Sequence, residues 1–329
     1  MHTLFPRTML SYLMALTIGC FVISASAHAQ AESFPSRPVT LIVPFQAGIS
    51  VDLLFRGMAE VAGRHLGQTV VVENKPGGSA TLGPATMAST AKPDGYTIAQ
   101  IAMPVLRMVH LQKVSYDPLK DFSWIMQVGG YTVGVVAPAS GPFKTWKDMI
   151  DFAKANPGKL TYTSPGPVTI NAIAMELIAR QEGTRFSHIP GKGAGESTAA
   201  LLGGHIMINV ESPGWASMVE SGQLRLLALL NNKRSKKWPD APSINELGYD
   251  YDFNAPFGLA GPKGMDPAVV RKLHDAFKKA YDDPKVVELF ERFDYTRLYL
   301  STEDYAAIIP RQFEYERQHL ERVGLKKKE

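Results

Sequence analysis

Short apolar runs alternate with amphipathic helical segments along almost the whole chain. Runs such as "TVVVEN" (residues 69–74) are apolar at consecutive positions, as in strands whose sheet is covered by helices on both faces. Strand-to-helix alternation of this kind favours parallel pairing, because each helix returns the chain to the start of the next strand. The pattern therefore predicts an α/β protein with mostly parallel sheets flanked by helices.

Two sets of strand–helix units precede a helical C-terminal third. The expected strands are Val39–Val43, Val70–Glu73, Tyr96–Ile101, Thr132–Ala137, Leu160–Thr163, Phe186–Ile189, Ile206–Val210 and Leu224–Leu229. The expected helices are Asp52–Leu66, Thr81–Ala91, Thr145–Ala155, Thr169–Gln181, Glu196–Leu202, Pro267–Tyr281, Pro284–Phe293 and Thr302–Val323. Open α/β sheets bind ligands at the carboxyl ends of their strands, so the loops that follow strands are the candidates for a site.

The first 29 residues have the pattern of a secretory signal peptide. Arg7 supplies a positive charge, residues 9–24 form an apolar stretch, and Ala27 and Ala29 place small residues before a cleavage point. A membrane anchor and a lipoprotein cleaved before Cys20 are the alternatives. Cys20 is the only cysteine, so cleavage after Ala29 leaves a mature chain without thiol or disulfide, exported to the periplasm.

Composition is that of an ordinary globular protein. The 329 residues are 45% hydrophobic and 20% charged, with a formal net charge of +4. The basic residues are scattered apart from two short lysine-rich clusters, which argues against a nucleic-acid partner.

Four loops after expected strands are rich in glycine or serine: residues 44–50, 74–80, 163–169 and 190–197. Such loops present free backbone N–H groups and the positive end of a helix, an arrangement suited to an anion such as a carboxylate. The common motifs of metalloproteases, α/β hydrolases and P-loop enzymes are missing, and the histidines have no metal-ligand spacing. The sequence thus predicts a binding protein with no metal and no cofactor, although a spatial Ser/His/Asp triad stays open.

The motifs "PSRPVTLIVPFQAGISVD", "LGQTVVVENKPGGSATLG" and "FGLAGPKGMDPAVVRKL" resemble the substrate-binding proteins of tripartite tricarboxylate transporters, the TctC or Bug family. The resemblance covers essentially the whole mature chain. It implies a periplasmic binding protein with two α/β lobes, a hinge and a deep crevice for a small carboxylate, delivered to a large and a small membrane subunit. It implies no catalysis.

Matching the family's motifs position by position gives the expected ligand-binding residues. They are Phe45, Ala47, Gly48, Ile49, Asp52, Gly77, Gly78, Ser79, Ser164, Gly166, Val168, Thr169, Lys192, Glu211 and Ser212. Ile49 and Val168 replace glycines of the family pattern, and a histidine and a tyrosine of that pattern are also replaced. The added apolar volume favours an aromatic dicarboxylate such as terephthalate, unless these residues lie outside the pocket.

We therefore expect a monomeric periplasmic receptor of a tripartite transporter. Residues 30–131 with 252–329 are expected to form lobe 1, and residues 132–251 to form lobe 2. An aliphatic dicarboxylate or tricarboxylate and an acidic amino acid are the alternative ligands. A sensor subunit of a two-component system, or an α/β hydrolase-like enzyme, are the alternative functions.

Overall fold

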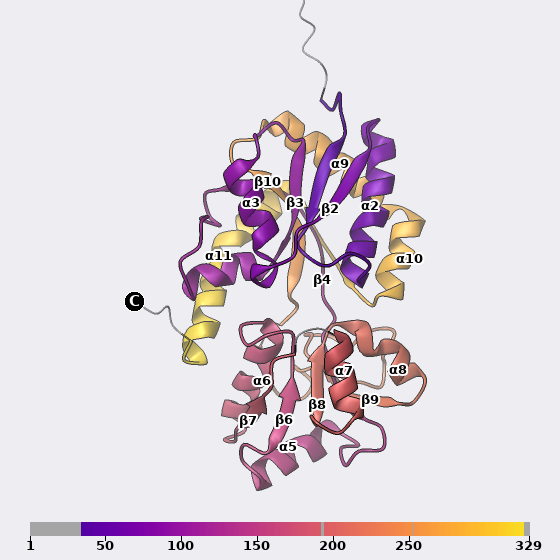
Figure 1. The fold of residues 1–329 in the computed structure, drawn as a ribbon, viewed down its shortest axis with the longest axis vertical. Coiled ribbons are helices and arrows are strands. Elements are labelled where there is room, and N and C mark those ends of the chain that lie inside the picture. The colour runs from indigo at the N-terminus through magenta and orange to yellow at the C-terminus, as the bar shows by residue number, and fades with distance from the viewer. Residues whose placement is uncertain (1–33, 192–193, 252, 326–329) are drawn as a thin grey trace, which may run out of the picture.

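The computed structural model describes residues 34–191, 194–251 and 253–325. The predicted signal peptide and Lys192 lie outside these ranges. The described chain forms two lobes, each built around its own sheet (Figure 1). The predicted two-lobed α/β fold is thereby confirmed.

The first lobe contains a six-stranded sheet. Its strands are β1 (Val39–Val43), β2 (Val70–Asn74), β3 (Thr97–Ala102), β4 (Phe122–Gly130), β10 (Pro256–Pro262) and β11 (Thr296–Leu300), in the order β11-β4-β10-β3-β1-β2. Its helices are α2 (Ser50–Leu66), α3 (Leu82–Thr90), α4 (Pro104–Arg107), α9 (Pro267–Asp282), α10 (Pro284–Arg292) and α11 (Thr302–Arg322), with 3₁₀ helices at Gly78–Ala80 and Met108–His110. One hydrophobic core joins α2, α9 and α10 to one face of the sheet, and another joins α3, α4 and α11 to the opposite face.

The second lobe contains a five-stranded sheet. Its strands are β5 (Gly134–Pro138), β6 (Leu160–Thr163), β7 (Phe186–His188), β8 (Ile208–Glu211) and β9 (Leu224–Leu229), in the order β7-β6-β8-β5-β9. Its helices are α5 (Trp146–Ala155), α6 (Ile170–Gln181), α7 (Ala194–Leu202) and α8 (Ala216–Glu220), with a 3₁₀ helix at Pro213–Trp215.

Both sheets are mixed, so the predicted mostly parallel pairing is wrong: of the nine strand pairings in the described ranges, four are parallel and five are antiparallel. β1 pairs in parallel with β2 and β3, and β6 with β7 and β8. β10 lies antiparallel between β3 and β4, and β5 lies antiparallel between β8 and β9. The direction of β10 has a topological cause. The chain leaves the first lobe after β4 and re-enters it at β10, so β10 runs opposite to β4.

Helix starts follow signals that are visible in the sequence. Thr145 and Asp148 form a reciprocal capping box at the start of α5, as the threonine there predicts. Asp266 and Asp283 cap α9 and α10, and each stands directly before a proline in the first turn. Within the described ranges, no helix combines the length and apolar character that a membrane span requires.

Candidate functional site

The loop between β1 and α2 is held in place by the carboxylate of Asp52. Asp52 is fully buried, and its Oδ2 accepts hydrogen bonds from Gly48 N at 2.8 Å and Arg56 Nε at 2.9 Å. Asn74 Nδ2 donates to Asp52 Oδ1 at 2.8 Å and to the carbonyl oxygen of Phe45 at 3.0 Å. Burial would raise the pKa of Asp52, but the hydrogen bonds from Arg56, Asn74 and Gly48 outweigh it and lower the pKa. Asp52 therefore fixes the conformation of the β1–α2 loop from its buried side.

The loops after β1 and β2 both use left-handed backbone. Gly48 has φ +84°, and Gly77 and Gly78 have φ +129° and +55°. Ser79 and Ala80 continue the second loop at φ +56° and +68°, which costs about 1 kcal/mol for a residue with a Cβ. Backbone strain of this kind persists where surrounding structure imposes it, and it is common at ligand sites.

An aromatic cluster lies beneath the first loop, where the chain crosses between the lobes. The ring of Tyr131, which follows β4, lies 6.4 Å from Phe45, 4.8 Å from Phe257 and 5.6 Å from Tyr295 between centroids. Ser50 Oγ and the Tyr295 hydroxyl are 2.5 Å apart, which ties the start of α2 to this cluster. The loop between β1 and α2 thus packs against a largely apolar cluster of aromatic side chains.

The second lobe contributes the loop between β6 and α6. Ser164 is fully buried, and its Oγ lies 2.8 Å from His188 Nε2 at the end of β7. Thr169 Oγ1 donates to the carbonyl oxygen of Gly166 at 2.8 Å, and Thr169 is the N-cap of α6. Burial lowers the pKa of His188, so the ring next to Ser164 is neutral at pH 7. Thr169 therefore fixes the shape of its own loop, and Ser164 joins that loop to the end of β7.

Glu211 ends β8 at the same edge of the second sheet. Burial raises the pKa of its carboxyl group, and the hydrogen bond from Asn209 Nδ2 at 3.4 Å only partly offsets this effect. Trp215 Nε1 donates to the Glu211 carbonyl oxygen at 2.9 Å and so holds the turn that contains the partly exposed Ser212. The strand end carries a carboxyl group whose ionised form is disfavoured.

Ile49 and Val168, which the sequence motifs predict to stand where the family pattern has glycine, lie outside the hydrophobic cores. Ile49 is the N-cap of α2, and the residue is 42% exposed. Val168 is partly exposed, and its carbonyl oxygen accepts a hydrogen bond from Arg107 Nη1 at 3.0 Å. Each apolar side chain is therefore accessible on a loop that belongs to the candidate site.

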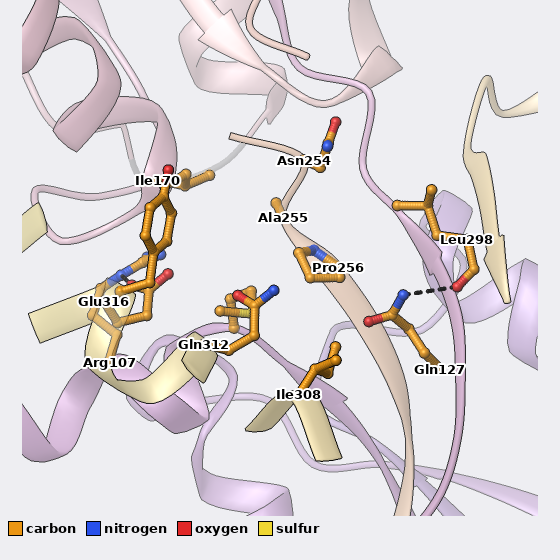
Figure 2. Close-up of a pocket in the computed structure, with 12 residues that line it drawn as sticks. Arg107, Gln127, Ile170, Asn254, Ala255, Pro256, Leu298, Ile308, Gln312 and Glu316 are labelled. Carbon is orange, nitrogen blue, oxygen red and sulfur yellow. Dashed lines mark hydrogen bonds and ion pairs between the residues drawn. The ribbon is translucent and has the colours of Figure 1, made fainter. Parts of the chain in front are cut away.

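A cavity of about 150 Å³ lies at the junction of the lobes (Figure 2). Arg107 and Glu316 form one wall, Ile170 reaches it from the second lobe, and Gln127 stands opposite, donating to the Leu298 carbonyl oxygen at 2.8 Å. Of the predicted ligand contacts that the structure describes, none lines this cavity. It adjoins the candidate site through Ile170, the residue directly after Thr169.

The described residues among the predicted ligand contacts lie at or after the carboxyl ends of strands. In Figure 1 these strand ends face the opposite lobe. The residues after β1 and β2 are Phe45, Ala47, Gly48, Ile49, Asp52, Gly77, Gly78 and Ser79. Those after β6, or at the end of β8 and beyond, are Ser164, Gly166, Val168, Thr169, Glu211 and Ser212. Lys192 is not described.

Sequence reasoning missed the residues that support these loops from behind: Arg56, Asn74, Arg107, His188 and Asn209. Asn74, His188 and Asn209 stand at or near the carboxyl ends of strands, which is the one signal that points to them. In the described part of the chain, no group of three or more His, Cys, Asp or Glu side chains is arranged to hold a metal ion.

Comparison with known proteins identifies one family model and several similar proteins that match most of the chain. A family model described as "Tripartite tricarboxylate transporter family receptor" matches residues 54–325. The "UPF0065 protein in gbd 5'region" of Cupriavidus necator is 46% identical over 315 residues, 96% of each chain. The protein BugT of Bordetella pertussis is 31% identical over 83% of this chain and 86% of its own.

Solved structures share the fold over nearly their whole length. The periplasmic binding protein BugD is 28% identical, with a TM-score of 0.78, over 90% of this chain and 100% of its own. A Rhodopseudomonas palustris protein with adipate (23% identical, 90% of this chain, 100% of its own) has a TM-score of 0.81. A malate-bound protein of that species (22% identical, 87% of this chain, 100% of its own) has a TM-score of 0.75.

The family model describes receptors, and the solved neighbours are binding proteins, so the expected absence of catalysis agrees with both. The family model matches more than half of the chain, residues 54–325, and the ordered loop motifs fall within or directly before this range. The chain belongs to the TctC family of tripartite tricarboxylate transporter receptors.

Proposed function

We propose that this protein is a periplasmic receptor that captures a small carboxylate between its two lobes and presents it to the membrane subunits of a tripartite transporter. The observation that carries the proposal is the first loop, whose left-handed turn at Gly48 is braced from behind by the buried Asp52. A loop held in this way keeps its conformation when no ligand is bound, which reduces the ordering cost of binding.

The mechanism is binding followed by closure. Backbone groups of the loops after β1 and β2 hold one carboxylate of the ligand. The loops after β6 and β8 then meet the ligand from the other lobe, and the closed form is the state that the membrane subunits recognise. The two R. palustris neighbours, solved with adipate and malate, support an acid with two carboxylates.

Within this class, we favour an aromatic dicarboxylate of the terephthalate type. Ile49 and Val168 supply accessible apolar surface where the family pattern has glycine. Glu211, with its raised pKa, is suited to donate a hydrogen bond to a distal carboxylate when protonated. Aliphatic dicarboxylates, tricarboxylates and acidic amino acids are the alternative ligands, and a sensor role would use the same site.

A thermal-shift screen with calorimetry on the hits tests the proposal. The panel contains terephthalate, phthalate, benzoate, adipate, succinate, citrate and aspartate, with terephthalamide as a neutral control of the same shape. A ligand present at 100 times its Kd stabilises the protein by about 2.7 kcal/mol. A shift with terephthalate but not terephthalamide supports both the assignment as a carboxylate receptor and the assignment of an aromatic ligand. A shift with aliphatic acids alone overturns the aromatic assignment, and no shift with any acid overturns the receptor assignment.

Export is part of the same proposal. Cleavage after Ala29 gives a mature chain that starts at Gln30. Mass spectrometry of the protein recovered from a periplasmic fraction checks this start. A chain retained in the cytoplasm with its first 29 residues intact contradicts it.

A further inference from the structure

The C-terminal helix α11 crosses from one lobe to the other. Near its start, Tyr305 and Ile309 belong to a core of the first lobe. At its end, Leu320 and Val323 belong to the core of the second lobe, and Arg180 of α6 donates to the Val323 carbonyl oxygen at 3.0 Å. The helix is therefore a third connection between the lobes, besides the segments β4–β5 and β9–β10.

Helix α11 contains a proline between the half that packs on the first lobe and the half that packs on the second. Pro310 lies inside the helix, between the residues that pack on the first lobe and those that pack on the second. A proline inside a helix removes one backbone hydrogen bond and favours bending there. Relative motion of the lobes must therefore displace the half of α11 that follows Pro310.

Arg107 lies where this moving half meets both lobes. It ends α4 of the first lobe and is only 1% exposed. Its Nε donates to Glu316 Oε2 on the second half of α11, and its Nη1 donates to the Val168 carbonyl oxygen at 3.0 Å. Among the described residues, its Nη2 has no hydrogen-bond partner. One guanidinium group thus links three elements: α4, α11 and the second-lobe loop.

The hydrogen bonds of Arg107 to Glu316 and to the Val168 carbonyl oxygen depend on the relative positions of the elements they join. A buried guanidinium needs an opposite charge, and Glu316, itself 2% exposed, supplies it. The planar fork of arginine then fixes the direction of the donor that faces Val168. The neighbouring cavity leaves space on one side of the pair, so the pair is not locked by packing alone (Figure 2).

We propose that Arg107 is a positioning residue of the ligand site: its pair with Glu316 sets the place of the Val168 loop relative to the first lobe. This inference rests on the proposed function, because the loop at Val168 and Thr169 is taken there as the second-lobe half of the site. Arg107 does not touch the ligand. It acts by favouring the lobe arrangement in which both halves of the site meet.

The double variant Arg107→Met/Glu316→Met tests this role. It removes both charges together, so no unpaired charge stays buried, and it removes the donor to Val168. We expect the Kd for terephthalate, or for adipate where terephthalate fails to bind, to rise about tenfold. The thermal midpoint should stay within about 3 °C of that of the unmodified protein. Arg107→Lys is the second variant, because an ammonium keeps the charge but lacks the fork that reaches both partners; its Kd should also rise.

The matched control is Arg180→Met/Glu176→Met. Arg180 also pairs with a glutamate and donates to a backbone carbonyl oxygen, that of Val323 directly after α11, but this contact lies within the second lobe. Its Kd should stay unchanged. Wild-type affinity in both Arg107 variants overturns the proposal, and so does an equal loss of affinity in the control.

A ligand-free measurement separates this inference from the proposed function. Spin labels at Leu119→Cys and Leu202→Cys, both on exposed positions of different lobes, report the distance between the lobes in the chain from Gln30 onward, which contains no other cysteine. If neither acid binds, the proposed function fails, and the distance distribution decides the inference. A broader distribution in Arg107→Met/Glu316→Met supports the positioning role, and an unchanged distribution overturns it.

Discussion

The Asp52 carboxylate accepts a hydrogen bond from the backbone N–H of Gly48 at 2.8 Å. The same oxygen accepts from Arg56 Nε at 2.9 Å, and the other oxygen accepts from Asn74. One buried side chain in the first turn of α2 therefore organises the loop that precedes the helix. Residues 46–49 of that loop stay exposed.

Replacing Asp52 with alanine should weaken both folding and binding. The change leaves the Gly48 N–H and the Asn74 amide without their acceptor, which should lower the free energy of unfolding by about 2 kcal/mol. Affinity for the carboxylate identified in the screen should fall about tenfold, because the first loop loses its brace. Chemical denaturation and calorimetry measure the two effects.

The control is Glu60→Ala on the same helix. Glu60 makes only exposed ion pairs with Arg64 and Lys285, so its removal should change stability by less than about 0.5 kcal/mol and leave affinity unchanged. Equal effects of the two variants would contradict the assigned role of Asp52.

Acid should remove the contribution of Asp52 to stability. Its pKa in the folded protein is lowered from the ordinary 3.8, so the contribution is complete above 3.8 and is lost as the pH falls through the folded pKa. The difference in unfolding free energy between the unmodified protein and Asp52→Asn should therefore be constant from pH 7 to 5 and shrink below pH 4. A difference that stays constant down to pH 2 would refute the assignment.

Ligand affinity should depend on pH through Glu211. Its pKa is raised from the ordinary 4.5, so the carboxyl group stays protonated at higher pH than usual and loses its proton as the pH rises through that value. The carboxylate then repels an anionic ligand, so affinity for a dicarboxylate should fall as the pH rises above the ordinary value of 4.5 and through the raised pKa of Glu211. Calorimetry on Glu211→Gln should give a flat profile, whereas the surface variant Glu220→Gln should keep the slope. The idea fails if Glu211→Gln keeps the slope as well.

Restoring the family glycines should change which acids bind. Ile49→Gly and Val168→Gly each remove apolar surface from a loop of the site, so affinity for terephthalate should fall about fivefold with little change for succinate. Leu119→Gly removes a similarly exposed apolar side chain away from these loops and should leave both affinities unchanged. Equal losses for both acids would mean that the glycines alter the backbone of the loops instead of the surface of the pocket.

A methyl group at Gly48 should strain the first loop without a steric clash. Its φ is +84° and no atom lies within 4 Å of an added Cβ, so Gly48→Ala should cost about 1 kcal/mol through backbone conformation alone. Gly158→Ala has the same properties in a turn of the second lobe. We expect equal losses of stability, measured by denaturation, but a loss of affinity only at Gly48. Weaker binding in both variants would point to a general effect.

Local signals in the sequence determined the strand–helix alternation, most helix starts and the loops that carry the candidate site. The capping box at Thr145 and the prolines that open α9 and α10 are contained within single segments, so a reader of the chain finds them without knowing its neighbours. The same holds for the glycine-rich turns after β1 and β2. These features depend on contacts between residues a few positions apart.

Only the tertiary structure decided the antiparallel insertion of β10, the crossing of α11 between the lobes, and the roles of Asp52 and Arg107. Asp52 meets Asn74 across 22 positions, and Arg107 meets Glu316 across 209. No periodicity records such a pairing. Asp52 and Asn74 meet when β2 pairs with β1, and Arg107 and Glu316 meet only when the chain returns from the second lobe. Asp52 holds the β1–α2 loop, and Arg107 joins the two lobes, only because each side chain is buried beside its partners. That burial follows from the packing of the whole fold and cannot be read from the residue type.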